Sequence, residues 1–508
     1  MILIVDFGSQ TCHLIGRRIR ECGVAVTIVP PEDAFKQINK IQPDGIIFSG
    51  GPAFVHDNNS PTVNPKIFSL GIPILAICYG HQLTAHLLGG KVKPGKTKEY
   101  GPAVIEINGA SKLFAHIIDN HFTVWMSHGD TVTVPPPGFT SPAQTKTAPV
   151  ALMQNEAKKI YSIQFHPEVK HTKYGALILR NFLKEICHLP IKRTILNPRT
   201  FIQSAKDVIG NRDEAIIAVS GGVDSTVAAA ILSRAIGNRL IPIYIDNGLM
   251  RYGNTETITQ LFHTLLRIPL KIIDAKKMFL DALRGVTDPE MKRKIIGRLY
   301  IECFEKEAKR HTKAKFLIQG TIYSDVIESK GTKHADKIKS HHNVGGLPDS
   351  MNLTLYEPLR SLYKDEVRQL GIKLHLPKHV VMQQPFPGPG QAIRIIGEVT
   401  QERLMRQHHA DRIVMEEMHR SGWYHKVFQS FPVLTDTKST AVKGDGRFYG
   451  EVVALRVYGS IDIMTASWSR LPYTLLQTIS SRIVNEVPGI SRVVYDITTK
   501  PPATMEWE

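Results

Sequence analysis

The chain contains few cysteines and no long apolar run. There are 5 cysteines among 508 residues, scattered without C-x-x-C spacing: Cys12, Cys22, Cys78, Cys187 and Cys303. This pattern argues against a disulfide framework and against a thiolate zinc site. No apolar stretch approaches the roughly 20 residues that a membrane helix needs, and the N-terminus lacks a basic segment ahead of an apolar one. We therefore expect a cytoplasmic protein without membrane association.

The composition excludes a small binding module and a disordered chain. Hydrophobic residues make up 42% and charged residues 21% of the sequence, enough to build packed cores. At about 150 residues per domain, the length suggests about three domains. Lysine and arginine number 63 against 46 for aspartate and glutamate, a net charge of +17. This excess favours nucleic acid or phosphorylated small molecules as partners without choosing between them.

Short apolar runs alternate with amphipathic segments in the first part of the chain. Buried parallel strands are predicted at four such runs: residues 2–5, 24–29, 45–48 and 72–77. The segments between them can hold crossover helices, so we expect an α/β domain with a parallel sheet. Ligands bind at the carboxyl ends of such strands, which directs attention to the residues just after each run.

Cys78 directly follows one of these runs. It lies on a predicted turn from strand to helix, between the small residues Ala76 and Gly80. The start of a helix stabilises a thiolate, so this position is typical of a nucleophile. Taken alone, however, a single cysteine is more often a buried core residue.

Two further segments supply the partners that a nucleophilic cysteine needs. His166, after the apolar run 160–164, can accept the thiol proton, and Glu168 can orient its imidazole. A histidine beside a proline is by itself more typical of a surface loop. A glycine-rich turn offers the backbone N–H of Gly51, which together with that of Tyr79 can bind an oxyanion.

Together these segments resemble the class I glutamine amidotransferases. The resemblance covers about residues 1–190 and implies a catalytic triad of Cys78, His166 and Glu168. It implies that Cys78 attacks the amide of glutamine, that ammonia leaves, and that water hydrolyses the glutamyl thioester.

Three positions depart from that family pattern. Ala76 stands where glycine is expected, His81 where methionine is expected, and Cys12-His13 where Tyr-Gln is expected. Ala76 remains small and His81 can still pack, so neither change is expected to displace the nucleophile.

Residues 90–97 match the phosphate-loop pattern G-x-x-x-x-G-K-[ST]. That motif needs a strand before it and a helix after it. Here a predicted helix precedes the match, and a strand-like run at 103–107 follows it. We therefore interpret residues 90–97 as a basic loop rather than a nucleotide site.

A second α/β pattern begins after a boundary near Leu189-Pro190. The run 215–219 predicts a strand and 227–232 a helix, and the loop between them offers curled backbone N–H groups, a helix start and hydroxyls. Phosphate binding is therefore expected from Ser220, Gly221, Gly222, Val223, Asp224, Ser225 and Thr226. Without a Walker lysine, the loop suits pyrophosphate better than a transferred γ-phosphoryl group. A bare S-G-G also fits an ordinary turn with an N-cap.

The full S-G-G-V-D-S string resembles the ATP pyrophosphatase, or PP-loop, family. The resemblance implies that ATP is split between its α- and β-phosphates and that an oxygen of the substrate is adenylylated. An adenosine site is expected at residues 246–251, and Asp325 is a candidate magnesium ligand, although capping is the commoner role for such an aspartate. The pair His341-His342 is not expected to bind metal, and residues 340–348 are interpreted as a basic lid over phosphates.

Residues 384–390 are too rich in proline and glycine for a helix or strand and predict a shaped loop or domain junction. Beyond them, strands are predicted at 452–457 and 492–497 and helices at about 400–420 and 471–487, which indicates a small α+β domain. The predicted fold class is thus two parallel-sheet α/β domains, one like class I amidotransferases and one like PP-loop nucleotide α-hydrolases, followed by this α+β domain.

Four segments carry a further resemblance: residues 220–226, 341–348, 385–390 and 500–508. Through them, the chain resembles over its full length a family of two-site amidotransferases that aminate a purine nucleotide. The resemblance implies a carbon–nitrogen ligase that makes GMP from xanthosine 5′-monophosphate (XMP), with glutamine as amido donor. ATP is then cleaved to AMP and pyrophosphate through an adenylyl-XMP intermediate, with Mg²⁺ beside it. The implied domains are an amidotransferase at 1–191, an ATP pyrophosphatase at 192–385, and a dimerisation and substrate-binding domain at 386–508.

That resemblance also implies a homodimer through the C-terminal domain, with Lys500 and Glu506 contacting XMP. Gln383 stands where the family pattern has arginine. If that arginine normally holds the substrate phosphate, its loss costs about 1.5–3 kcal/mol unless another cation, such as Lys500, compensates.

Two other functions stay open at this point. A PP-loop enzyme that modifies tRNA would explain the charge of +17, but thiolating enzymes need catalytic cysteines beside the loop, and only Cys303 lies in that domain. Nucleic acid is therefore not expected as a partner. A non-catalytic relative that acts as a binding module is the second alternative, and it predicts no glutaminase activity.

Overall fold

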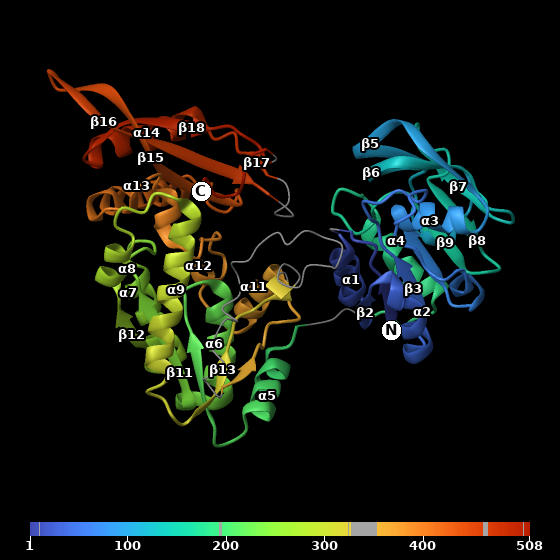
Figure 1. The fold of residues 1–508 in the computed structure, drawn as a ribbon, viewed down its shortest axis with the longest axis horizontal. Coiled ribbons are helices and arrows are strands. Elements are labelled where there is room, and N and C mark those ends of the chain that lie inside the picture. Colours follow the sequence, from blue (N-terminus) through green and yellow to red (C-terminus); the bar gives the residue numbers. More distant parts are fainter. Residues whose placement is uncertain (10, 193–195, 324, 327–352, 461–465, 501) are drawn as a thin grey trace. The chain divides into compact units, whose positions relative to one another are not determined.

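The computed structural model describes residues 1–508 except 10, 193–195, 324, 327–352, 461–465 and 501 (Figure 1). Over these described residues, the chain divides into two compact units, residues 1–192 and the residues from Leu196 onward, and each is described by itself. Among the described residues, no helix is long and apolar enough to cross a membrane. The predicted lid at 340–348 lies outside the described residues.

The first unit is built on a nine-stranded sheet, in the order β2-β1-β3-β4-β9-β8-β7-β5-β6. Its parallel part consists of β2 (Val26–Val29), β1 (Ile2–Val5), β3 (Gly45–Phe48), β4 (Ile74–Ile77) and β9 (Ile160–Ile163). Every residue of β1, β3, β4 and β9 is buried, which explains why these segments are mostly apolar. The four strands predicted from the N-terminal sequence are confirmed.

Helices cover both faces of this parallel part. One face packs against α1 (Cys12–Glu21) and α4 (Gly175–Asn181), and the other against α2 (Pro31–Ile41) and α3 (Tyr79–Leu87). Alternate residues of β1 point to opposite faces, so Ile2 and Ile4 join the first hydrophobic cluster while Leu3 and Val5 join the second. Three short helices complete the unit: η1 (Pro65–Ser69), η2 (Lys112–Phe114) and η3 (Phe182–Ile186).

The sheet continues into antiparallel strands, of which the sequence analysis predicted only the run 103–107, the end of β5. They are β8 (Leu152–Asn155), β7 (Thr140–Gln144), β5 (Lys91–Ile107) and β6 (His121–Val134). The interpretation of residues 90–97 as a loop was therefore wrong, because most of them belong to β5. Pairing with β6 satisfies the backbone there, and a register shift between Pro94 and Glu99 accommodates the proline and glycine. A strand, not a helix, follows, so the segment is no phosphate loop.

The second unit contains a five-stranded parallel sheet in the order β12-β11-β10-β13-β14. The strands are β10 (Glu214–Ala218), β11 (Leu240–Asp246), β12 (Lys271–Asp274), β13 (Ala314–Ile318) and β14 (Thr354–Tyr356). Strand order reverses beside β10, the kind of switch point where α/β sheets bind ligands. The strand predicted at 215–219 is confirmed.

Two layers of helices enclose this sheet. One face packs against α8 (Lys276–Ala282) and α9 (Pro289–Ala308). The other packs against α5 (Pro198–Ile209), α6 (Val223–Ile236), α7 (Asn254–Gln260), α11 (Lys364–Lys373) and α12 (Lys378–Val381). The short η4 (Gly237–Arg239) and η5 (Leu261–Leu266) follow α6 and α7. Residues 227–232 of α6 are fully buried, so this helix lacks a polar face.

The last part of the second unit is an α+β layer. After η6 (Gly390–Arg394) come α13 (Gln401–Arg420), β15 (Gln429–Lys443), β16 (Gly446–Gly459), β17 (Ser467–Trp468), α14 (Tyr473–Glu486) and β18 (Ile490–Asp496). The predicted strands and helices of this region are confirmed. One hydrophobic cluster includes Ile216 and Ile243 of the parallel sheet as well as Val453 and Leu455 of β16, so the two parts share a core.

Candidate active sites

Cys78 lies on a strained turn between β4 and α3. Its backbone has φ 53° and ψ −105°, a conformation that residues other than glycine rarely adopt. The Cys78 N–H donates to the Ile163 carbonyl at 2.9 Å, which anchors the turn on β9. Glycine is required at position 80, because a Cβ on Gly80 would lie 2.7 Å from the Phe48 Cβ. The turn presents the thiol at the carboxyl end of the sheet.

His166 and Glu168 lie beside this thiol. The His166 Nδ1 and Glu168 Oε1 atoms are 2.7 Å apart, and both side chains are buried. A Cβ on Gly50 would lie 3.5 Å from the Cys78 Cβ and 3.1 Å from the His166 Cε1, so both residues border the same glycine. Burial alone would lower the pKa of His166, but the charges of Glu168 and Cys78, with hydrogen bonds to both, raise it well above its usual value. The structure thus brings the three predicted triad residues together.

Two further residues hold Glu168. The Thr11 hydroxyl donates to Glu168 Oε1 at 2.6 Å, and the Arg18 Nε donates to the Glu168 carbonyl at 3.2 Å. The Ser9 hydroxyl lies 2.9 Å from that of Thr11 and donates to it. One carboxylate oxygen therefore accepts from both an imidazole and a hydroxyl.

The two predicted oxyanion donors lie in different surroundings. Tyr79 is the first residue of α3, and the first N–H groups of a helix have no partner within it. Gly51 packs against the backbone that follows β1, since a Cβ there would lie 2.6 Å from the Phe7 carbonyl oxygen. Gly50, rather than Gly51, borders both reacting side chains.

The departures from the amidotransferase pattern are accommodated inside the first unit. His81 is fully buried, with its Nδ1 2.8 Å from the Ser162 hydroxyl. Burial lowers the pKa of His81 to about 3, so the side chain is neutral. Cys12 is also fully buried, and burial, followed by the charge of Asp6, raises the pKa of its thiol well above the usual value. Cys12 therefore lacks the thiolate character of a second nucleophile.

In the second unit, the predicted phosphate loop curls between β10 and α6. Gly221 has a φ of +83°, and Gly222 is the N-cap of α6. The loop's own hydroxyls bond within it: Ser225 Oγ donates to the Gly222 carbonyl at 3.1 Å, and the Gly222 N–H donates to Ser220 Oγ at 3.3 Å. Ser220 and Gly222 are exposed, so a ligand can reach their polar groups.

The rest of the predicted loop forms the first turn of α6, where Val223 and Thr226 are buried. The Lys364 Nζ donates to Asp224 Oδ2 at 2.5 Å. The other carboxylate oxygen, Oδ1, is buried and has no hydrogen-bond partner. A Cβ on Gly320, after β13, would lie 3.0 Å from the Asp224 carbonyl carbon, so the end of β13 abuts the loop.

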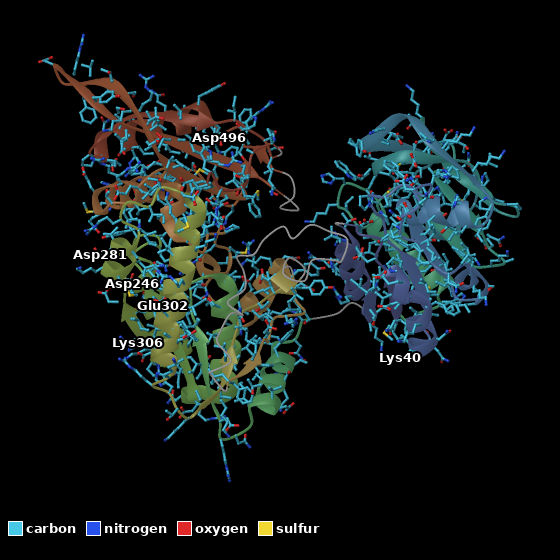
Figure 2. The ribbon with its side chains drawn as sticks, viewed as in Figure 1. Lys40, Asp246, Asp281, Glu302, Lys306 and Asp496 are labelled. Carbon is cyan, nitrogen blue, oxygen red and sulfur yellow. The ribbon has the colours of Figure 1, made fainter. Side chains whose placement is uncertain are left out.

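Two aspartates follow or end the strands on either side of β10. Asp246 ends β11 (Figure 2), and its Oδ2 accepts from the Thr255 hydroxyl at 2.9 Å and from Lys276 Nζ at 3.0 Å. Asp325 Oδ2 accepts from the Ile322 N–H at 3.0 Å and so caps its own turn. Within the part of the chain that the structure describes, no cluster of three or more His, Cys, Asp or Glu side chains is arranged to hold a metal ion.

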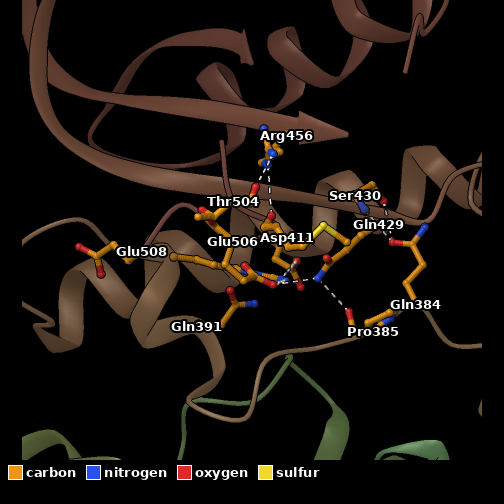
Figure 3. Close-up of polar contacts among 12 residues, drawn as sticks. Gln384, Pro385, Gln391, Asp411, Gln429, Ser430, Arg456, Thr504, Glu506 and Glu508 are labelled. Atoms are coloured by element: carbon orange, nitrogen blue, oxygen red, sulfur yellow. Dashed lines mark hydrogen bonds and ion pairs between the residues drawn. The ribbon is translucent and has the colours of Figure 1, made fainter. Parts of the chain in front are cut away.

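The predicted substrate residues lie near the C-terminus. Glu506 accepts from Arg394 Nε at 3.0 Å and Nη2 at 2.9 Å, and from Gln429 Nε2 at 3.0 Å (Figure 3). Lys500 pairs through its backbone with Ala466, with N–H to carbonyl distances of 2.8 and 3.1 Å. The Gln383 carbonyl accepts from Arg368 Nη2 at 2.8 Å, so a cation lies near this position.

Sequence reasoning missed several partners of the predicted residues: Thr11, Lys364, Arg394 and Gln429. Thr11 follows β1, so inspecting every strand end for hydroxyls would have drawn attention to it. No local pattern marks the others, because Lys364 lies 140 residues from Asp224 and Arg394 lies 112 residues from Glu506.

Two family matches cover the two ends of the chain. Residues 3–186 match the family glutamine amidotransferase class-I. Residues 416–507 match the family GMP synthase C terminal domain. With its strand-to-helix turn at Cys78 and the adjacent His166 and Glu168, the first unit is a class I glutamine amidotransferase domain.

Relatives that match over the whole length specify the family further. The chain is 50% identical over 510 residues to a glutamine-hydrolyzing GMP synthase from Caldanaerobacter subterraneus, covering 100% of this chain and 99% of that one. It is 50% identical over 513 residues to one from Nitratiruptor, with the same coverage, and 49% identical over 508 residues to one from Carboxydothermus hydrogenoformans, again with the same coverage. The chain belongs to the glutamine-hydrolysing GMP synthases, which are glutamine-dependent ligases. These relatives favour this family over the tRNA-modifying alternative.

Proposed function

We propose that the chain aminates XMP to GMP in two coupled half-reactions, one in each unit. The first unit hydrolyses glutamine to glutamate and ammonia, and the second uses ATP to activate the C2 oxygen of XMP. The proposal is carried by the buried contact of His166 with Glu168 beside Cys78, in a chain 50% identical over its full length to glutamine-hydrolyzing GMP synthases.

In the first half-reaction, Cys78 is the nucleophile. The raised pKa of His166 favours transfer of the thiol proton to its imidazole, which leaves a thiolate beside an imidazolium. The thiolate attacks the amide carbon of glutamine, and the N–H groups of Gly51 and Tyr79 stabilise the oxyanion. His166 gives a proton to the departing ammonia and then acts as base while water hydrolyses the glutamyl thioester.

In the second half-reaction, the loop 220–226 holds the β- and γ-phosphates of ATP. The exposed Ser220 and Gly222 and the start of α6 supply hydrogen-bond donors and positive potential. The C2 oxygen of XMP attacks the α-phosphorus, pyrophosphate leaves, and adenylyl-XMP forms. Ammonia adds at C2, AMP leaves with the oxygen, and GMP remains.

Magnesium is proposed to accompany ATP. Asp224 Oδ1 is buried without a hydrogen-bond partner, and an unpaired carboxylate oxygen beside a phosphate loop suits this oxygen-preferring cation. One oxygen of Asp325 already accepts from the Ile322 N–H, so we place Asp224 ahead of Asp325 as the residue that would hold the ion. When bound, Mg²⁺ offsets the negative charge of the leaving pyrophosphate.

XMP is proposed to bind at Lys500 and Glu506. Arg368, whose guanidinium reaches the Gln383 carbonyl, is a candidate to replace the charge of the arginine that the family pattern has at position 383. We further propose the three-domain division at 1–191, 192–385 and 386–508, a homodimer through the last of these, and a cytoplasmic location.

The test combines the full chain with ATP, magnesium, XMP and either glutamine or an ammonium salt, and follows GMP, AMP and glutamate. Wild type is expected to make GMP from both nitrogen sources. Cys78→Ala is expected to lose the glutamine-dependent reaction by at least about 10³-fold, because no other group replaces the nucleophile. Its ammonium-dependent rate is expected to stay within about twofold of wild type. Glutamate formation without any GMP would contradict the proposed acceptor, and GMP formation from glutamine by Cys78→Ala would contradict the proposed nucleophile.

A further inference from the structure

We infer that Asp411 is a positioning residue of the second unit. It holds residues 246–254, beside the proposed ATP site, in place relative to Glu506 at the proposed XMP site. The inference rests on the proposed placement of ATP at the loop 220–226 and of XMP at Glu506. It adds a residue that the family resemblance and the sequence patterns did not single out.

Asp411 lies on α13 between two guanidinium groups. Its Oδ2 is 3.2 Å from Arg251 Nε, and its Oδ1 is 4.0 Å from Arg394 Nη1. The Asp411 side chain is 3% exposed and that of Arg394 is fully buried. With Glu506 bound to Arg394, the cluster has two positive and two negative charges. This balance matters because a buried charge is tolerated only when it is paired.

The two guanidinium groups also share an aromatic ring in the loop 384–390. The Cζ atoms of Arg251 and Arg394 lie 5.0 and 4.9 Å from the centroid of the Phe386 ring. Arg394 additionally lies 4.0 Å from the centroid of the Phe431 ring. The ring attracts each cation, but the two cations repel each other. Asp411 contacts both and therefore holds them at this spacing.

On one side, Asp411 is connected to the proposed ATP site through residues 246–254. The Leu249 carbonyl of this segment accepts from the Gln391 N–H at 2.7 Å, so the segment is tied to η6. At its far end is Asn254, whose side-chain nitrogen would lie 3.1 Å from a Cβ on Gly221 of the phosphate loop. The conformation at Arg251 therefore affects how the segment meets that loop.

On the other side, Asp411 is connected to the proposed XMP site through Arg394. Two hydrogen bonds join this guanidinium to Glu506, whose side chain is 16% exposed and can meet a ligand. Figure 3 shows Glu506 and Asp411 together in this network. Because Arg394 is held by two rings and by Asp411, it fixes the carboxylate that the substrate would contact.

The cluster depends on charge more than on hydrogen bonds. Four of its buried atoms have no hydrogen-bond partner: Arg251 Nε, Arg251 Nη2, Arg394 Nη1 and Asp411 Oδ1. An amide at position 411 would keep the shape of the side chain but lose the charge that opposes two guanidinium groups. Residues 246–254 and Glu506 would then no longer be held at a fixed distance from each other.

The test measures ammonium-dependent GMP formation by the full chain while ATP and XMP are varied. Asp411→Asn is expected to lower kcat/KM for both ATP and XMP by about 10–100-fold, the scale of a small misplacement of reacting groups. Glu416→Gln, an acid-to-amide change at a 42%-exposed side chain of the same helix, is the matched control and is expected to stay within about twofold. Hydrolysis of glutamine without nucleotides is expected to be unchanged in both.

The double variant Arg251→Met/Asp411→Asn separates positioning from stability. It restores charge balance in the cluster, so its Tm is expected to recover towards wild type while kcat/KM stays low. Recovery of kcat/KM along with Tm would show that Asp411 is merely structural and would overturn the inference.

If Asp411→Asn fails to fold, Arg251→Lys replaces it, because lysine keeps the charge without the planar contact. A larger loss of kcat/KM for ATP than for XMP is then expected, and kinetics equal to those of Glu416→Gln would overturn the inference. A wild-type chain that makes no GMP from ammonium would instead contradict the proposed function itself.

Discussion

The two candidate sites differ in how complete they are without a ligand. In the first unit, one oxygen of Glu168 accepts from both His166 and Thr11, and these groups are buried around Cys78. In the second unit, the hydroxyls of Ser220 and Ser225 lie 3.3 Å apart and face each other at an exposed loop. The groups of the first site are held by the protein itself, whereas those of the second are bonded within their own loop. Under the proposed function, the second site exchanges these internal hydrogen bonds for phosphate oxygens.

The largest effect is expected from a change at Glu168 in the first site. Glu168→Gln removes the charge that orients His166 and contributes to its raised pKa, so the imidazolium becomes less stable. Glutamine hydrolysis is expected to fall by about 10³-fold. The ammonium-dependent rate, measured in the same preparation, is expected to be unchanged. A loss smaller than tenfold would mean that the carboxylate is dispensable.

A smaller effect is expected from a change in the proposed phosphate loop, residues 220–226. Gly221→Ala places a Cβ on a residue with φ +83°, which costs about 1–2 kcal/mol and turns backbone N–H groups away from phosphate. kcat/KM for ATP is expected to fall by about 100-fold. Gly237→Ala is the matched control, because Gly237 has φ +58° with open space around it at the other end of α6. Equal ATP kinetics in both variants would contradict a role of the loop in binding.

Thr11→Val sharpens the comparison by removing a single donor from the buried site. Glu168 then keeps the His166 contact but loses the 2.6 Å bond from the hydroxyl. A fall of about tenfold in kcat for glutamine hydrolysis is expected, with little change in KM. Thr11→Ser is expected to restore activity because it restores the hydroxyl. Thr27→Val, on β2 of the same unit, serves as a control, and no rescue by Thr11→Ser would point to packing instead.

The smallest effect concerns stability rather than activity. The pKa of His81 is lowered to about 3 in the folded chain, against about 6.5 when unfolded. Between these values the unfolded state binds the extra proton, so stability is lost as pH falls, by up to about 1.4 kcal/mol per pH unit. His81→Met is expected to reduce the fall in Tm between pH 7 and 5. His121→Met, at a 63%-exposed histidine side chain, is expected to leave that fall unchanged, and equal Tm profiles in both variants would contradict the lowered pKa.

The parallel part of the first sheet was predictable because its strands are buried on both faces and read as apolar runs, as in residues 2–5 and 45–48. Apart from the run 103–107, the antiparallel part was not, since Pro94 and Gly95 and several lysines interrupt the apolar pattern of β5. Only pairing with β6, the next strand along the chain, makes this segment a strand.

In the candidate sites, too, some residues could be predicted from the sequence and others could not. Cys78 and His166 were predictable because each follows a strand at its carboxyl end. Arg394 was not, because its bond to Glu506 joins residues 112 positions apart. Thr11 could have been noticed as a hydroxyl after a strand, but not its bond to Glu168, which lies 157 positions away. Sequence patterns at strand ends identify the residues proposed to react. The residues that hydrogen-bond to them come from distant parts of the sequence and are found only in the folded structure.

The hydrogen bond between the Cys78 turn and β9 also limits how early the growing polypeptide can hydrolyse glutamine. The Cys78 N–H bonds to the Ile163 carbonyl, so β4 acquires this neighbour only after 85 further residues have been made. Contacts that span so much sequence form late in folding. A nascent chain that ends before His166 therefore carries a thiol without its base, and glutamine is spared from hydrolysis until the first unit is nearly whole.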